Sequence, residues 1–398
     1  MKRCLVPIFW MALCAAWVGS VVAQSDPPNG YYDAAIGKTG AALKSALHDI
    51  IKGHTQLLYT SSSTDTWDAL RDIDKNPANP AQVVLVYSGF LATAADQYNG
   101  QTGSWDREHL WPQSYGLVVF SDGSRAKTDI FNLRPIEVKT NEIRLNKYYD
   151  TTTPPGSSYA QAPQSSYDGD SWEPRLEDKG LIARSLFYMA VRYDGTDSDV
   201  PDLELSDTPN SSQYKFGKLT TVLAWNRLVP VTASERARNH RIYTTYQHNR
   251  NPFIDHPEFA DLVFVAGATP GQAWKSLHFT TAELANNTIS GDTADPDNDG
   301  LKTVVEYAFH RDPRVPERTP LVTPKANADG SVQLVFTHNR WATDATLSYE
   351  TSSDLLTWTP VAGQVIGTTV TNYETEQLTV RLPGTGPKLF ARIRVTKP

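Results

Sequence analysis

The stretch SWDREHLWPQSYG, residues 104–116, places an acid directly before a histidine, at Glu108 and His109. A second stretch, FNLRPIEVKTNEIRLN at residues 131–146, supplies asparagine and arginine side chains. Metal-assisted hydrolysis of a phosphodiester needs a base that takes a proton from water, a hard oxygen ligand for Mg²⁺ and cationic donors for the phosphate. The two stretches contain all three kinds of group, and His109 can be the base because neutral imidazole is available near neutral pH.

The elements that carry these residues must bring them together. We expect Glu108 and His109 to lie on an extended segment, where neighbouring side chains point to opposite faces. Both can then serve one site only where the strand twists or ends, and Pro112 supplies such an end.

The second stretch is predicted to form a helix. Pro135 suits the first position of a helix, so residues 135–146 are expected to be helical. Asn141, Arg144 and Leu145 are neighbours on one side of such a helix. The helix could therefore present Asn141 and Arg144 to the strand.

A separate acidic segment, DPDNDGLKTVVE, fits the template of a calcium-binding loop, D-x-D-x-D-G followed by glutamate at the twelfth position. In such a loop, a hard cation is bound by oxygens from alternate residues. Glycine permits the sharp turn, and the last glutamate completes the coordination shell. The alternative interpretation is an exposed acidic turn without a metal. No helix is evident before the loop, so a complete EF-hand is not expected. The matching residues are Asp295, Asp297, Asp299, Gly300 and Glu306.

Periodicity divides the chain into two kinds of region. Helical spacing of apolar residues occurs around residues 40–53, 177–195 and 219–228, while AQVVLVYSG at 81–89 is typical of a buried strand. Residues 157–170 are rich in Ser, Gln, Pro and Gly and are predicted to be a loop. Beyond Val322, short alternating runs separated by turn residues indicate a small β-sandwich.

The predicted fold is therefore α+β, with a helix-rich first domain at residues 29–275 and an accessory β-sandwich at 322–398. A linker at 276–321 contains the acidic loop, residues 295–306. With 398 residues, 40% hydrophobic and 20% charged, the composition is that of a globular protein.

The first residues are predicted to direct export. Lys2 and Arg3 precede an apolar run, and cleavage after Ala23 would remove residues 1–23 as a signal peptide. Cys4 and Cys14, the two cysteines of the chain, fall in this segment, so the mature protein would contain neither disulfides nor a cysteine nucleophile. No other segment is expected to span a membrane. The protein is predicted to be secreted or periplasmic.

The net negative charge of the protein does not favour binding to nucleic acid, which is also negatively charged. The formal net charge is −7, and loss of the signal peptide, which carries two cations, makes it more negative. Residues 125–147 are locally basic, however, with six Lys and Arg against three acidic residues.

Four ordered blocks carry a family resemblance: DREHLWPQSYG, DIFNLRPIEVKTNEIRLN, WEPRLEDKGLIARSLFYMAVRY and QHNRNPFIDHPEFA. In this order they resemble the motifs of bacterial extracellular or periplasmic endonuclease I proteins, over about residues 31–265. These are ββα-metal nucleases, also called His-Me finger nucleases, that cut DNA and often RNA with little sequence preference.

The resemblance implies roles for individual residues. It places His109 at the position of the general base, and Glu108 and Asn141 at the positions that hold a catalytic Mg²⁺. Arg144 and Asn146 match an arginine and a second asparagine of the family's helix; Arg144 is a candidate catalytic residue and Asn146 a further candidate ligand of Mg²⁺. The implied products carry 5′ phosphates.

Three positions depart from the family pattern, and one of them is His248, where the family usually has glycine. Lys127 stands where a member has glutamate, and Phe131 replaces a histidine. If that glutamate acts through its backbone carbonyl, lysine changes little; if through its carboxylate, proton donation to the leaving group is affected. The phosphate-binding arginine does not align uniquely, and Arg125 is the candidate.

The sequence thus predicts a secreted, Mg²⁺-dependent endonuclease acting on DNA, and possibly RNA, with a calcium-stiffened accessory domain. The alternative is a non-catalytic secreted binding or adhesion protein on the same scaffold. A monomer is expected, and the ligand of the β-sandwich is left open.

Overall fold

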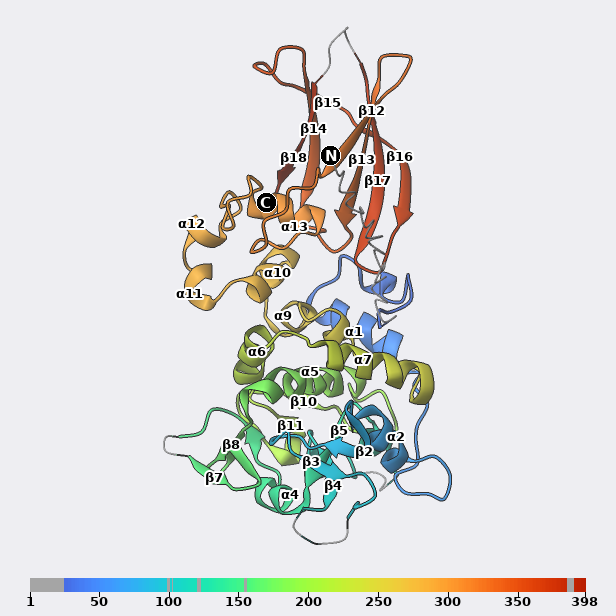
Figure 1. Ribbon diagram of the computed structural model, residues 1–398, viewed down its shortest axis with the longest axis vertical. Helices are drawn as coiled ribbons and strands as arrows, with labels where there is room; N and C mark the ends of the chain where they lie inside the picture. The colour runs from blue at the N-terminus through green and yellow to red at the C-terminus, as the bar shows by residue number, and fades with distance from the viewer. Residues whose placement is uncertain (1–24, 99–100, 102, 120–122, 154–155, 385–389) are drawn as a thin grey trace, which may run out of the picture.

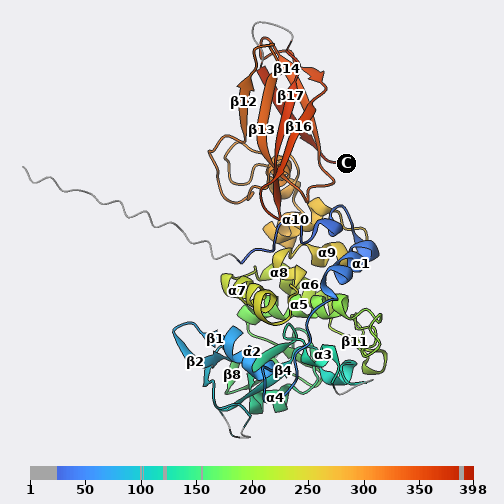
Figure 2. The ribbon, with the colours of Figure 1, turned by 90° about the vertical axis from the view of Figure 1, so that its right-hand side faces the viewer.

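The computed structural model describes residues 25–98, 101, 103–119, 123–153, 156–384 and 390–398. The predicted signal peptide lies outside these residues. The molecule is elongated, with a helix-rich part at one end and a β-sandwich at the other (Figures 1 and 2). This arrangement confirms the mixed α+β fold with a β-rich C-terminal region.

Helices form the middle of the first part. The 17-residue helix α5 (Leu176–Arg192) lies at its centre, where nearly every side chain after Gly180 is buried. The predicted helices near residues 40–53, 177–195 and 219–228 are confirmed. The helices of this part are α1 (Gly40–Ile51), α2 (Thr66–Ile73), α3 (Arg125–Thr128), α4 (Val138–Arg144), α5, α6 (Leu219–Leu228), α7 (Ala233–Arg241), α8 (Pro252–Asp255), α9 (Phe259–Phe264) and α10 (Pro270–His278).

Short helical turns connect these helices. They are η1 (Asp33–Ala35), η2 (Gln113–Tyr115), η3 (Ser211–Gln213) and the π-helical turn η4 (Ile242–Tyr246). Within the described residues, no helix is both long enough and apolar enough to cross a membrane.

Small sheets surround the helices at the end of the molecule farthest from the β-sandwich (Figure 1). They are the antiparallel sheet β1 (Lys75–Asn76), β2 (Asn79–Val84) and β3 (Leu91–Thr93); the pair β4 (Trp105–His109) and β5 (Leu133–Glu137); the sheet ordered β6 (Tyr148–Tyr149), β9 (Ser171–Glu173), β8 (Ala162–Tyr167) and β7 (Ser157–Tyr159); and the parallel pair β10 (Glu204–Leu205) and β11 (Lys215–Phe216).

Two sequence-based predictions are wrong here. Residues 157–170 form the hairpin β7–β8 instead of a loop, because β8 pairs with β9 and Ser165 donates a hydrogen bond to the carbonyl of Tyr87. Pro135 lies in β5, opposite Arg107, so helix α4 begins only at Val138.

The C-terminal part consists of two packed antiparallel sheets. One is ordered β12 (Val322–Ala326), β13 (Val332–Asn339), β17 (Thr375–Leu382) and β16 (Gln364–Val370); the other is β15 (Thr359–Val361), β14 (Thr346–Ser352) and β18 (Phe390–Thr396). Their core contains Leu334, Phe336, Val380 and Leu382, together with Phe309 of α13 (Thr303–Phe309). The predicted β-sandwich is present, and it takes part of its core from the preceding segment.

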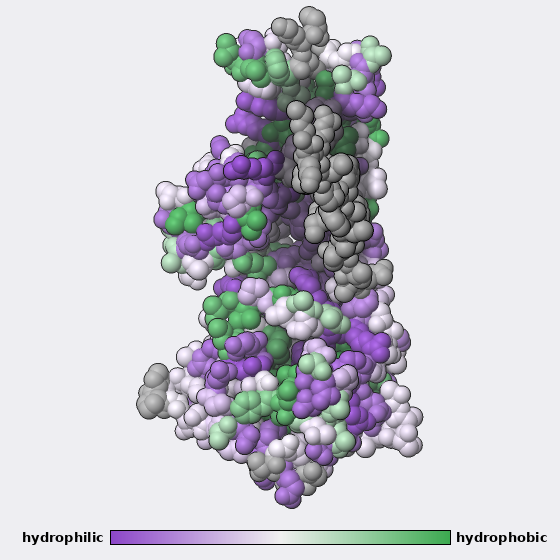
Figure 3. Space-filling model, viewed as in Figure 1, coloured by the Kyte–Doolittle hydropathy of each residue, from purple (hydrophilic) through white to green (hydrophobic). Residues whose placement is uncertain are grey.

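The two parts are in contact. Trp341 packs on His256 and Phe259 of the helical part, with ring centroids 4.4 and 5.2 Å apart. Between the parts, α11 (Thr281–Leu284), α12 (Asn287–Ser290) and the loop before α13 form a projection. Hydrophilic residues predominate on this projection (Figure 3).

Candidate active site

Strands β4 and β5 and helix α4 form a ββα unit at the tip of the helical part (Figures 1 and 2). The strands pair in antiparallel register, with Glu108 opposite Arg134 and His109 opposite Leu133. Helix α4 follows β5 directly, because the side chain of Glu137 caps its first turn by accepting a hydrogen bond from the Thr140 amide at 2.7 Å. This compact unit holds the acid–histidine pair beside the asparagine helix.

A cavity of about 270 Å³ lies over this unit. Residues from both faces of β4 line it, up to the end of the strand at His109. The residues lining it are Tyr59, Asp106, Arg107, Glu108, His109, Pro112, Gln113, Ser114, Asn141, Arg144, Leu145 and Asn146. The structure therefore brings together five of the predicted site residues: Glu108, His109, Asn141, Arg144 and Asn146.

Glu108 is buried and fixed from two directions. The hydroxyl of Tyr87 donates a hydrogen bond of 2.6 Å to its Oε1, and Nε of Arg144 lies 3.2 Å from the same oxygen. Burial raises the pKa of Glu108, while Arg144 and Tyr87 oppose this effect. Within the described part of the chain both contacts fall on Oε1, so Oε2 is available to a cation.

His109 has a defined tautomer. Its Nε2 lies 3.0 Å from the backbone carbonyl of Lys127, and a carbonyl only accepts, so Nε2 carries the proton. Nδ1 therefore holds the lone pair, and it lies 3.3 Å from the side-chain amide of Gln113. Burial lowers the pKa of His109 to about 3, and the charges of Arg107, Lys127 and Arg144 act in the same direction. The imidazole is thus neutral, with its lone pair on Nδ1.

The hydrogen bond from His109 to the carbonyl of Lys127 shows how lysine can replace the family's glutamate at this position. His109 is oriented by a backbone atom, which lysine provides as well as glutamate does. Phe131, the second departure, is buried against Tyr188 with ring centroids 4.6 Å apart. It belongs to the core and is not among the described residues that line the cavity.

Arg144 lines the cavity, and its contacts are with Glu108 and with the backbone. Its side chain is 1% exposed, lies behind Glu108, and donates hydrogen bonds to the carbonyls of Leu110 and Leu145. It is a positioning residue for Glu108.

Asn146 reaches the cavity because the backbone turns at Leu145, where φ is +54°. Its amide donates to Ser114 Oγ at 3.3 Å. The residue therefore joins the rim of the cavity to the turn after β4.

Arg125 is not brought into the cavity. Its side chain lies 3.8 Å from Asp197, and its backbone amide donates to Asp199. Arg107 lines the cavity, as Arg144 does, and its guanidinium lies 3.4 Å from the centre of the Tyr59 ring. Sequence reasoning did not identify Arg107 as part of the cavity wall.

Sequence reasoning missed three further residues of the site. Tyr87 and Tyr149 share a 2.6 Å hydroxyl contact next to Glu108, and both come from distant segments. Asp106 lies two residues before Glu108, on the same face of β4, and its carboxylate also lines the cavity. The alternation of a strand could have identified Asp106.

The donor set suits a hard divalent cation. Glu108 offers a carboxylate oxygen and Asn141 an amide oxygen, and Asp106 adds a second carboxylate beside them. Such oxygen ligands are those that Mg²⁺ prefers. These residues could hold Mg²⁺ next to the proton-accepting Nδ1 of His109.

The predicted calcium ligands lie far from this cavity. Asp295, Asp297 and Asp299 cluster in the loop before α13, and Glu306 lies on α13 itself. They form a second candidate centre, in the junction between the two parts.

Comparison with known proteins places the first part of the chain in a family. Over 246 residues the chain is 49% identical to an extracellular ribonuclease of Bacillus amyloliquefaciens, which covers 62% of this chain and 81% of that protein. It is also 49% identical over 235 residues to an extracellular ribonuclease of Bacillus subtilis, which covers 59% of this chain and 78% of that protein. The model of the Endonuclease I family matches residues 39–258, so the chain belongs to the Endonuclease I family.

Proposed function

We propose that the protein is an extracellular, Mg²⁺-dependent endonuclease that hydrolyses phosphodiester bonds of RNA and DNA with little sequence preference. Membership of the Endonuclease I family supports a nuclease. The observation that carries the proposal is the neutral His109, whose Nδ1 lies in a cavity also lined by the oxygen ligands Glu108 and Asn141.

The residues of the cavity divide the chemistry between them. His109 accepts a proton from water at Nδ1, while Nε2 donates to the Lys127 carbonyl and so keeps the ring in place as it becomes positive. The water oxygen bonds to phosphorus as the bond from phosphorus to the 3′ oxygen breaks, which leaves a 5′ phosphate. Mg²⁺ bound by Glu108 and Asn141 would neutralise charge on the phosphate and on the departing oxygen.

Fixing Glu108 is part of the same mechanism. Tyr87 and Arg144 hold one carboxylate oxygen, so the other keeps a constant position relative to His109. Because this ligand is already in place, less free energy is needed to arrange the cation and the water at each turnover.

The substrate class follows from the nucleophile. Because water attacks, the reaction does not use the ribose 2′ hydroxyl, and DNA is expected to be cut as well as RNA. The names of the Bacillus relatives, both extracellular ribonucleases, support RNA as a substrate and an extracellular location.

The test is cleavage of the same sequence, prepared as RNA and as DNA, by mature protein with Mg²⁺ or EDTA. We expect His109→Ala to lose about 10²- to 10⁴-fold in rate on both substrates, because the base is removed. His248→Asn is the matched control: His248 is exposed, and asparagine tolerates its backbone φ of +60°. Equal rates for the wild type and His109→Ala, or full activity in EDTA, would refute the proposal.

A further inference from the structure

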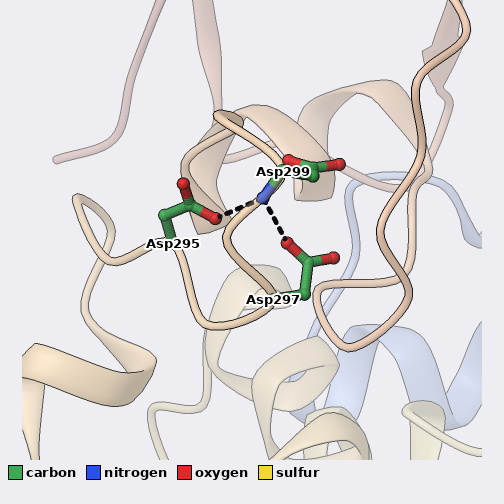
Figure 4. A group of neighbouring side chains, drawn as sticks. All are labelled: Asp295, Asp297 and Asp299. Carbon is green, nitrogen blue, oxygen red and sulfur yellow. Dashed lines mark hydrogen bonds between the residues drawn. The ribbon is translucent and has the colours of Figure 1, made fainter.

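The acidic loop is folded around its own carboxylates. Asp295, Asp297 and Asp299 each offer an oxygen, and these oxygens lie within 4.8 Å of one another. The backbone amide of Asp299 donates to Asp295 and to Asp297, both at 3.2 Å (Figure 4). Gly300, with φ of +97°, makes the turn and donates its amide to Asp295 at 3.0 Å. Like charges are thus held together at one point.

Glu306 adds a buried carboxyl group beside this cluster. The residue is 1% exposed, and neither carboxylate oxygen has a hydrogen-bond partner among the described residues. The first turn of α13 is joined to the start of the loop, because the amide of Thr303 donates a hydrogen bond of 2.9 Å to the carbonyl of Ala294. Burial raises the pKa of Glu306 to about 8, and the charges of Asp297, Asp299 and Asp295 add to the effect. Oδ2 of Asp297 is a further buried oxygen without a partner. Buried carboxylates are unfavourable unless they are paired or coordinate a metal.

We propose that Asp295, Asp297, Asp299 and Glu306 bind one Ca²⁺ ion, which fixes the loop to helix α13. The ion would supply the positive charge that the buried oxygens lack. Ca²⁺ fits better than Mg²⁺, because it accepts six to eight oxygens in a flexible shell, whereas Mg²⁺ requires near-octahedral geometry and keeps several waters.

The site lies where it controls the junction. Phe309, three residues after Glu306, packs on Phe336 of the β-sandwich with ring centroids 5.4 Å apart. Asp299 also accepts a hydrogen bond of 2.9 Å from the amide of Glu317, in the segment that leads to β12. On the same helix, Tyr307 lies 5.2 Å from Trp274 of α10, measured between ring centroids. Ca²⁺ therefore stabilises a helix that contacts both parts of the molecule.

Thermal unfolding and calorimetric titration of the mature protein with CaCl₂ test this site without using activity. We expect binding with a Kd on the order of 10⁻⁴ to 10⁻³ M, the range of extracellular calcium modules. At about 10 mM CaCl₂, the unfolding temperature should rise by roughly 5 °C relative to EDTA. MgCl₂ should give a smaller rise.

Glu306→Gln removes one proposed ligand and so tests whether the stabilisation comes from the bound cation. This variant should lose the response to CaCl₂, yet in EDTA it should unfold at or above the wild-type temperature, because the buried acid beside the three aspartates is gone. If it fails to fold, the more exposed Asp297→Asn replaces it, with the same loss of response expected. Asp329→Asn, in the β-sandwich and outside the loop, is the control that keeps the response.

The active site is tested separately with Glu108→Gln, which should keep the calcium-dependent rise in unfolding temperature. The proposal is overturned if the wild type shows neither heat nor stabilisation at about 10 mM CaCl₂. It is equally overturned if Glu306→Gln responds like the wild type, or if Glu108→Gln alone abolishes the response.

Discussion

Nε of Arg144 lies 3.2 Å from Oε1 of Glu108, and both side chains are almost completely buried. The arginine comes from the last turn of α4 and the glutamate from the middle of the ββα unit, so the ion pair joins helix to strand directly beneath the cavity. In a buried pair, the carboxylate is charged only because its partner is present. Arg144 therefore acts on the candidate Mg²⁺ site through Glu108.

Replacing Arg144 should affect both stability and metal binding. Arg144→Met leaves Glu108 buried without its cation, and breaking such a pair typically costs about 3–5 kcal/mol in the free energy of unfolding. Urea denaturation measures this loss. The double variant Arg144→Met with Glu108→Gln should recover part of it, because the unpaired charge is removed. A double variant less stable than Arg144→Met would contradict the pairing.

Tyr87 supplies the second contact to Glu108, so removing its hydroxyl should loosen the same carboxylate. Tyr87→Phe is expected to cost about 1–3 kcal/mol in unfolding free energy and to raise the Mg²⁺ concentration that gives half-maximal cleavage. Tyr98→Phe, at an exposed tyrosine, is the matched control. An unchanged Mg²⁺ requirement in Tyr87→Phe would show that Tyr87 does not position Glu108.

Lys127 orients His109 through its backbone carbonyl, so its side chain should matter little to the base. We expect Lys127→Ala to lose far less activity than the about 10²- to 10⁴-fold expected for loss of the base. Steady-state kinetics on RNA and DNA measure the difference, with His109→Ala for comparison. A loss as large as that of His109→Ala would instead assign the lysine side chain a direct role in the reaction.

The sequence is sufficient to predict the parts of the site that depend on local structure. The extended Glu108–His109 pair and the helical Asn141 follow from residue spacing within single elements, and the structure places all three at one cavity. The supports of the site cannot be predicted in this way. Tyr87 is 21 residues from Glu108, and the Lys127 carbonyl is 18 residues from His109, so tertiary folding alone brings them together.

Local composition also gives a wrong prediction where a segment pairs with residues that are distant in the sequence. The polar segment 157–170 forms a hairpin because β9 and the carbonyl of Tyr87 satisfy its hydrogen-bonding groups. Pro135 fits a helix start by its local preference, yet its carbonyl accepts a hydrogen bond from Val86 at 2.8 Å and its backbone pairs within β5. Local propensity is weaker than these contacts.

His54 should make the stability of the fold depend on pH. It is buried, and its Nδ1 accepts a hydrogen bond of 2.9 Å from Nε of Arg192, which requires the neutral ring. Burial lowers its pKa from 6.5 to about 4, with Arg192 acting in the same direction and Asp129 opposing it. Between these two values the unfolded chain therefore binds a proton that the folded protein does not.

The contribution of His54 to stability is thus complete above about pH 6.5 and is lost as the pH falls towards about 4, for a total of about 3 kcal/mol. Urea denaturation at several pH values measures this slope in the wild type and in His54→Gln, whose amide oxygen can still accept from Arg192. The variant should show a flatter decline over this window, whatever its stability at neutral pH. Parallel curves for the two proteins would mean that His54 titrates in the folded state near its ordinary pKa, and that the acid sensitivity comes from other buried groups.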